Sequence, residues 1–476
     1  MLSSHSMPVA TDTRARWLPP LLVVLAVGIA YANALQASFQ FDDWDVIVRD
    51  PRVQSLAAWW ASMPGMRPVL KLSYALNHAS GFGVTGFHLV NILIHAGNGL
   101  LMLYLMQRLE TQTGHRSGGL ALAATLIFVL HPVQTEAVTY ASGRSTSLSA
   151  FFALASIAVW VAGRSGTQRA ALYMYGASPL LMLLGIATKE SAVMVPAILL
   201  LWAAADVSRP FSWRQIGQQS ALHWLLLLVA LFTALLLPAY QQFLATSLAT
   251  RSMAENLIAQ LHGITWLLSQ LLDIDRLNAD PALQVQTTLD LNGSMLLVGI
   301  VVAAGTAISN IRRYPLPAFA VLWFLLWMAP GNSLLARLDL VNDRQLYTAL
   351  AGPALLLAAA IHRLGRQQRY LAVTGLSAVL LLEGFATHLR NEVYRDEVGF
   401  WRDVVVQSPH NARAWNNLGI ALAADCDLDR AEFAWRKALA TDPGYVRAAV
   451  NLRLLEQGLL PEGLGPCRNL SHPDGA

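Results

Sequence analysis

Four aspartates lie within nine positions of the stretch FQFDDWDVIVRDP, residues 39–51, which directly follows a long apolar run. A loop needs polar residues, but it does not need the two adjacent carboxylates of Asp42 and Asp43. A carboxylate held near a hydroxyl can act as a general base and take its proton. The alternative is structural, because Asp also caps helices and stabilises turns, as Asp50 before Pro51 would. Asp42 and Asp43 are therefore the candidate catalytic residues.

Further ionisable residues interrupt apolar sequence in the stretches LHPVQTEAVTYASGR, TKESAVMVP and NDRQLY. A charge at the centre of a bilayer costs about 2.5–3.5 kcal/mol, so such residues persist mainly when they are paired, exposed to water or functional. The candidate substrate-binding residues are His131, Glu136, Arg144, Lys189, Glu190, Asp343 and Arg344. Structural alternatives exist: His131 could end a helix and Arg144 could anchor a span at the interface. Lys189 and Glu190 could form a local ion pair, and Arg344 could cap a loop.

Carboxylates and cations gathered at a membrane surface suit a reaction on a lipid-linked anionic donor, such as a sugar on a polyprenyl phosphate. Arg or Lys would hold the charge that grows on the leaving phosphate. An Asp with an ordinary pKa of about 3.9 is a weak base, so proton removal must accompany a largely dissociated leaving group. The chain has no Gly-x-Ser-x-Gly elbow, phosphate-cradling loop or HExxH motif that would indicate hydrolysis or nucleotide use.

The composition predicts an all-α, polytopic helical membrane protein. Hydrophobic residues make up 55% of the chain and charged residues 13%, whereas soluble domains carry about a quarter charged residues. Apolar runs of about 20 residues, long enough to cross a bilayer, recur along most of the sequence. The net charge is only +4, and the arginines cluster in short loops. This pattern is typical of membrane topology and argues against a nucleic-acid partner.

We expect about eleven spans, with the N-terminus inside the cell. They are expected at 17–37, 86–107, 118–132, 146–163, 171–187, 190–206, 221–239, 293–309, 316–331, 346–362 and 369–386. The first resembles a signal peptide but is too long for one, so we interpret it as an uncleaved span. Residues 255–272 are interpreted as interfacial or re-entrant, because a span there would move the later arginine clusters to the opposite side.

The expected organisation is a membrane domain over 1–390, a helical repeat fragment over 391–460 and a flexible tail over 461–476. Two large loops, 38–85 and 240–292, and all the candidate residues are predicted to share the outer face. The first loop also contains short amphipathic pieces suited to lying on a membrane surface.

Residues after Ala412 match the tetratricopeptide pattern, whose period is 34 residues. The matches are Trp415, Leu418, Gly419, Leu422, Ala431, Trp435, Ala438 and Pro443. A generic helical hairpin is the alternative. Because repeat arrays usually need about three repeats to stand alone, we expect this fragment to lean on the membrane domain or on a partner. Cys426 and Cys467 lack the spacing of a metal or redox motif, and a disulfide between them would require a non-cytosolic location.

The ordered motifs FDDWDVIVRDPRV, RPVLKLSYALNHASGFGVTGFHLVNILIHAGNGLLMLYL, LHPVQTEAVTYASGR, TKESAVMVP and NDRQLY resemble those of the transmembrane and tetratricopeptide-repeat-containing proteins. That family belongs, with the protein O-mannosyltransferases, to the multi-span glycosyltransferase C superfamily. The resemblance implies that the acidic pair contains the catalytic base. It implies a polyprenyl-phosphate monosaccharide donor, often mannose, and a protein Ser or Thr acceptor presented by the repeats. A Glu-Arg turn common in the family is Asp343-Arg344 here, which leaves the role of Asp343 open.

The leading hypothesis is an integral-membrane glycosyltransferase of the bacterial inner membrane, with its active site and repeat fragment on the periplasmic side among membrane lipids. The sequence indicates no required cofactor and leaves a divalent metal open. One alternative keeps this chemistry with a lipid or cell-surface glycan as acceptor. Another is a non-catalytic membrane scaffold whose repeat recruits a partner. A transporter is disfavoured, because transporter sites lie near the bilayer midplane.

Overall fold

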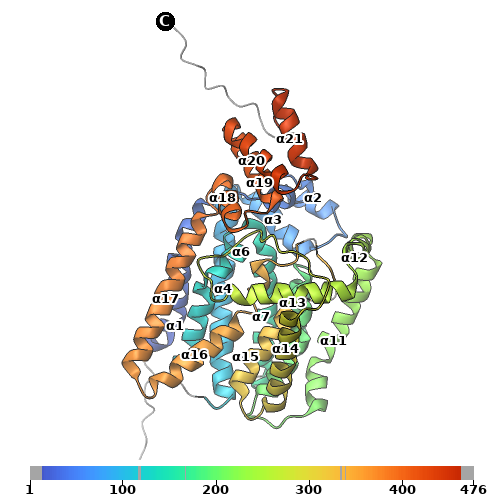
Figure 1. Ribbon diagram of the computed structural model, residues 1–476. Coiled ribbons are helices and arrows are strands. Elements are labelled where there is room, and N and C mark those ends of the chain that lie inside the picture. Colours follow the sequence, from blue (N-terminus) through green and yellow to red (C-terminus); the bar gives the residue numbers. More distant parts are fainter. Residues whose placement is uncertain (1–12, 116–118, 167, 333–334, 338, 462–476) are drawn as a thin grey trace, which may run out of the picture.

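A computed structural model describes residues 13–115, 119–166, 168–332, 335–337 and 339–461. These residues form helices, turns and loops, and the described part of the chain contains no strand. Figure 1 shows a bundle of long helices with a smaller group of C-terminal helices at one end. Cys467 and the expected tail after Pro461 lie outside the described residues.

Apolar helices of different lengths build the bundle. They are α1 (Thr13–Ala30), α4 (Gly83–Gln112), α5 (Leu120–Leu130), α7 (Arg144–Arg164), α9 (Ser178–Ile186), α10 (Val195–Ala205), α11 (Trp213–Leu236), α14 (Leu291–Asn310), α15 (Pro315–Met328), α16 (Ala351–Gly365) and α17 (Arg369–Glu392). Short helices α6 (Thr135–Val138) and α8 (Ala170–Leu172) lie between them. Every expected span overlaps one of these helices.

Five helices are long and apolar enough to cross a membrane by length and composition. They are Gly83–Gln112, Ala141–Arg164, Trp213–Leu236, Leu291–Asn310 and Arg369–Glu392. A sixth would be the pair Leu120–Leu130 and Pro132–Val138, which is bent by 53° at Pro132, a residue that cannot continue the helical hydrogen bonding. The other apolar helices are shorter, so the count of eleven spans stays a prediction.

Burial separates the centre of the bundle from its periphery. In α7, 78% of the apolar window is buried, whereas in α14 only 11% is. The fully buried Trp160, Trp202 and Trp323 fill the space between helices. Outward-facing apolar helices such as α14 suit contact with lipid, because lipid tails impose no penalty on exposed apolar side chains.

Further short helices lie toward the end of the bundle that carries the C-terminal helices (Figure 1). They are α2 (Leu56–Ala61), α3 (Pro68–Ser80) and α12 (Pro238–Thr250). Helix α13 (Met253–Ser269) begins with a capping box formed by Ser252 and Glu255. Figure 1 shows α13 running crosswise to α14 and α11, which agrees with the expectation that residues 255–272 do not span the membrane.

Helices α18 (Glu397–Gln407), α19 (Ala412–Ala424), α20 (Leu428–Thr441) and α21 (Val446–Glu456) form the C-terminal group. Its centre is Trp435, which is fully buried in α20. Trp435 Nε1 donates a hydrogen bond to the Asn416 carbonyl at 3.1 Å. A Cβ atom added to Gly419 would lie 2.4 Å from Trp435 Nε1. The small residue and the large aromatic therefore fit together, while the assignment to tetratricopeptide repeats stays a prediction.

We expect Gly419→Ala to destabilise the α19–α20 pair by about 1–3 kcal/mol, because the new methyl group overlaps a buried indole. Hydrogen exchange in the full chain should show faster exchange in both helices. The matched control is Gly375→Ala in α17, where nothing lies within 4 Å of an added Cβ. Equal exchange in the two variants would contradict this packing.

Candidate functional site

Asp43 fastens the segment after α1 to the turn before α7. Its side chain is completely buried. Oδ1 accepts a hydrogen bond from the Ser142 backbone N–H at 2.7 Å, and Oδ2 accepts one from the Gln40 N–H at 3.0 Å. Burial raises the pKa of Asp43 from 3.8 to about 7, although the two N–H groups lower it. Both oxygens are thus engaged and covered, and Asp43 is not among the described residues that line the cavities of the site, so its catalytic role stays a prediction.

Asp42, the residue before Asp43, lines cavities instead of being fully covered. Its backbone N–H donates to the Tyr140 hydroxyl at 2.8 Å. Its half-buried side chain lines a first cavity of about 450 Å³ and a third cavity of about 270 Å³. Burial raises the pKa of Asp42, and the nearby Arg344 lowers it. A carboxylate in this position is a stronger base than one in water.

Arg344 lines the same two cavities as Asp42 and a second cavity of about 210 Å³. Its Nε lies 2.9 Å from Glu136 Oε1, and its backbone N–H donates to Glu136 Oε2 at 3.1 Å. The guanidinium also lies over the Tyr140 ring, 5.4 Å from the centroid. Glu136, on the short helix α6, therefore fixes the direction of Arg344, and a buried pair of this kind is sensitive to loss of either partner.

The second cavity gathers more cations than carboxylates. Lys189, Arg67, Arg337 and Arg344 line it together with Glu190. Glu190 pairs with Arg67 at 2.8 Å instead of with its neighbour Lys189, whose Nζ donates to the Thr146 hydroxyl at 2.6 Å. Burial lowers the pKa of Lys189, and Arg337 and Arg344 lower it further. An anion entering this cavity would relieve the repulsion among the cations.

Arg144 and His131 are not among the described residues that line these cavities. The Arg144 guanidinium is buried and donates to Asn91 Oδ1 at 2.6 Å and to the Phe87 carbonyl at 2.9 Å. His131 Nδ1 accepts a hydrogen bond from the Val133 N–H at 3.2 Å and so closes its own turn. Both side chains hold local structure.

Asp343 is buried beside Arg344, and its Oδ1 has no hydrogen-bond partner among the described residues. Burial and the nearby Glu136 raise its pKa. The structure thus places Asp42, Lys189, Glu190 and Arg344 on cavities that have Arg344 in common, whereas Asp343 is buried and lines none of them among the described residues.

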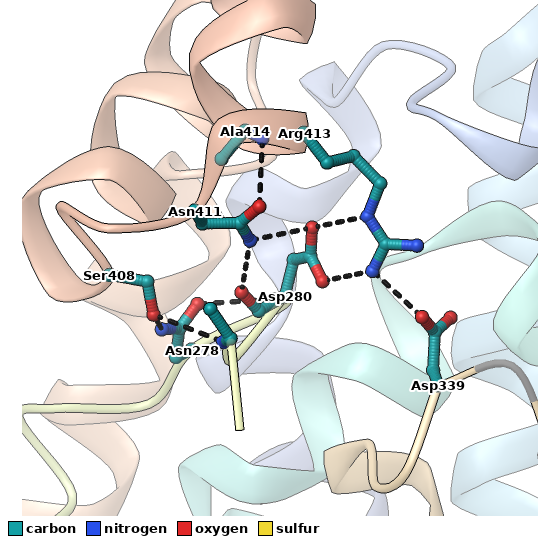
Figure 2. Close-up of polar contacts among 8 residues, drawn as sticks. Asn278, Asp280, Asp339, Ser408, Asn411, Arg413 and Ala414 are labelled. Carbon is teal, nitrogen blue, oxygen red and sulfur yellow. Dashed lines mark hydrogen bonds and ion pairs between the residues drawn. The ribbon is translucent and has the colours of Figure 1, made fainter. Parts of the chain in front are cut away.

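The C-terminal helices dock beside the site through Arg413 of α19, as Figure 2 shows. Arg413 Nε donates to Asp280 Oδ2 at 2.9 Å, and its Nη2 donates to Asp339 Oδ1 at 2.7 Å. Asn411 Nδ2 donates to the Asp280 carbonyl and to Asp280 Oδ2, each at 3.0 Å. One arginine therefore joins three segments: helix α19, the loop 240–292 and the loop that carries Arg344.

An aromatic contact continues this junction toward the acidic pair. The guanidinium of Arg413 lies 5.8 Å from the ring centroid of Phe41, the residue before Asp42. The same ring meets Trp401 of α18 edge-on, at 5.2 Å between centroids. The position of the C-terminal helices is therefore coupled to the loop that carries Asp42.

Two arginines that line the second cavity, Arg67 and Arg337, were not predicted from the sequence as site residues. Arg67 precedes Pro68 at the start of α3 and adopts a left-handed backbone with φ of 51°. In the sequence alone, Arg67 resembles an ordinary surface arginine. Arg337 belongs to none of the motifs that the sequence analysis singled out. The available clue was their location in loops assigned to the same face as Asp42. Phe243 of α12, which borders all three cavities, carried no signal at all.

Among the residues that the structure describes, no three His, Cys, Asp or Glu side chains gather in a group that could hold a metal ion. Backbone N–H groups engage the Asp43 carboxylate, and arginines engage those of Glu136 and Glu190.

The raised pKa of Asp43 predicts a pH dependence of stability. Between pH 3.8 and about 7 the folded protein holds a proton on this carboxyl that the unfolded chain releases. The contribution of Asp43 to stability therefore falls as the pH rises through that window. Asp43→Asn removes the ionisation, so its thermal unfolding midpoint should fall less between about pH 5 and about pH 7.5 than that of the parent protein. Parallel pH profiles of the two proteins would contradict the assignment.

Arg413→Gln should detach the C-terminal helices from the loop 240–292, because a buried carboxylate, Asp280, loses its charged partner. Hydrogen exchange should increase in α18, α19 and around Asp280, with little change in α7. Arg436→Gln is the control, since Arg436 is exposed and pairs within its own helix α20. A protection pattern for Arg413→Gln that matches the control would show that the junction does not hold the helices.

Three curated relatives carry related sequence. Protein O-mannosyl-transferase F38B6.6 of Caenorhabditis elegans is 27% identical over 462 residues, covering 91% of this chain and 64% of that protein. Human protein O-mannosyl-transferase TMTC3 is 23% identical over 486 residues, covering 90% and 52%. Mouse protein O-mannosyl-transferase TMTC4 is 33% identical over 168 residues, covering 29% and 23%.

No protein-family model matches the chain, and no solved structure matches it. The chain spans between about a quarter and about two thirds of the length of these relatives. The alignments with F38B6.6 and with human TMTC3 each cover about nine tenths of the chain. Over most of its length, the chain is thus similar in sequence to protein O-mannosyl-transferases F38B6.6 and TMTC3.

Proposed function

We propose that the protein is an integral-membrane glycosyltransferase that moves a mannosyl or similar hexosyl group from a polyprenyl-phosphate donor to a Ser or Thr hydroxyl of a protein. The observation that carries this proposal is that Asp42 and Arg344 line two cavities in common. A base and a phosphate-binding cation thereby face one space at the end of a bundle of apolar helices. The relatives are named protein O-mannosyl-transferases, which supports the sugar and the class of acceptor.

The cation-rich second cavity suits the donor phosphate. Arg344, Lys189, Arg67 and Arg337 offer charged donors there, and such hydrogen bonds to phosphate are stronger than neutral ones. As the bond between the sugar C1 and the phosphate oxygen breaks, both bonding electrons leave with the polyprenyl phosphate. The added negative charge develops against groups that are already oriented, so little reorganisation is needed.

Asp42 is the proposed base. The acceptor hydroxyl oxygen attacks C1 from the first cavity, the new C1–O bond forms, and the hydroxyl proton passes to the Asp42 carboxylate. The raised pKa of Asp42 makes this transfer less unfavourable than for an ordinary Asp. Asp43 is proposed to position Asp42, and Glu136 to position Arg344.

The C-terminal helices support a protein acceptor. Arg413 and Trp401 contact the loops that carry Asp339 and Phe41, so a polypeptide resting on these helices would lie beside the first cavity. A lipid or surface-glycan acceptor would use the same base and cations but would have no need of this junction.

The proposed location is a bacterial inner membrane, with the cavities on the periplasmic side. The turns between α10 and α11, between α14 and α15, and between α16 and α17 contain Arg209, Arg312, Arg313 and Arg366, and they lie at the end of the helices opposite the C-terminal group (Figure 1). An excess of Arg in short loops marks the cytoplasmic side of a membrane protein.

Donor turnover tests the proposal. Purified full-length protein in nanodiscs should consume one member of a panel of polyprenyl-phosphate sugars when a cell-envelope extract supplies the acceptor. Asp42→Asn should reduce this turnover by at least about a hundredfold, as expected for loss of a general base. Below the raised pKa of Asp42, turnover by the parent protein should also fall.

Asp45→Asn is the matched control, because Asp45 belongs to the same loop but is exposed and pairs with Arg49. It should retain turnover. If Asp42→Asn and Asp45→Asn behave alike while both remain folded, Asp42 is not the base. If no donor is consumed, the scaffold hypothesis replaces the transferase.

A further inference from the structure

A groove separate from the three cavities of the site lies at the end of the bundle opposite Asp42 and Asp43. The turn that joins α16 to α17 is at this end, far from the C-terminal helices (Figure 1). A groove of about 480 Å³ runs between the start of α5, the end of α16 and the start of α17. Its walls are apolar and include Leu120, Ala123, Ile361, Val373 and Leu376.

Basic side chains line the same groove. They are His362, Arg366 and Arg369. None of the described lining residues is acidic, and neither arginine forms a side-chain hydrogen bond or an ion pair with any residue that the structure describes. The charge of the groove is therefore uncompensated within the described chain.

Arg369 places its positive charge at the N-terminal end of a helix. It is the first residue of α17, and a cation at a helix N-terminus opposes the helix dipole. The preceding residue, Gln368, makes no side-chain capping hydrogen bond, so the first N–H groups of α17 receive no cap from it. An anion at this point would satisfy both the cation and the free N–H groups.

We propose that this groove binds an anionic phospholipid. The phosphate would lie at Arg366 and Arg369, and an acyl chain would lie along the apolar wall. Basic pockets between membrane helices have the chemistry that such headgroups need. A free phosphate ion would use the arginines but not the apolar wall, and a zwitterionic lipid would use the wall but would not compensate the charge.

The proposed phospholipid and the proposed sugar donor bind at opposite ends of the helices. The donor phosphate is assigned to the cavity of Lys189 and Arg344, at the other end of the helices. The two lipids would therefore belong to opposite leaflets, and this inference does not depend on the transferase activity.

Lipid binding is the direct test. The full chain in neutral detergent would be titrated with phosphatidylglycerol or with phosphatidylcholine of the same acyl chains. Native mass spectrometry would count retained lipids, and thermal unfolding would report stabilisation. Phosphatidylglycerol should be retained and should raise the unfolding midpoint by several degrees more than phosphatidylcholine. In Arg366→Gln/Arg369→Gln, retention should fall about tenfold and the difference between lipids should disappear.

The control is Arg214→Gln/Arg363→Gln, which removes two exposed arginines that do not line the groove and should bind like the parent protein. Val373→Trp fills the groove without changing its charge, at a position that is 58% exposed, and should also reduce retention. Equal retention of the two lipids, unchanged binding in both groove variants, or an equal shift with inorganic phosphate alone would each overturn the proposal.

Discussion

The site depends on one buried carboxylate. Asp43 joins the chain segment after α1 to the turn before α7 by accepting hydrogen bonds from the Ser142 and Gln40 N–H groups. Burying a carboxylate is costly unless its oxygens are satisfied, and here each oxygen has a backbone donor. These bonds fix the loop at Asp43, and the side chain of the preceding residue, Asp42, lines two cavities together with Arg344.

Charge is distributed unevenly across the site. Glu136 holds Arg344 and Glu190 holds Arg67, but Lys189 has only a hydroxyl partner among its short contacts. Cations confined together in a partly buried space repel one another, and an incoming anion converts that repulsion into attraction. The ion pairs therefore serve to aim the cations, while the surplus positive charge remains for a ligand.

Much of this arrangement could be predicted from the sequence, because helices of apolar residues and the charges at their ends are local signals. The helical class and the gathering of Asp42, Lys189 and Arg344 followed from them. The division of roles within the acidic pair could not be predicted, since the donor that engages Asp43 belongs to Ser142, 99 positions away. Arg144 was expected to bind phosphate, but its guanidinium is engaged by residues of α4, which no spacing in the sequence reveals.

The central claim is that Asp42 and Arg344 act across one cavity on a phosphate-linked donor. A cryo-EM structure of the full chain with a non-cleavable polyprenyl-phosphate mannose analogue tests it most directly. We expect phosphate density within hydrogen-bond distance of the Arg344 guanidinium, with the sugar C1 turned toward the space beside Asp42. Phosphate density elsewhere, with the cavity between these residues left empty at saturating analogue, would rule out this arrangement.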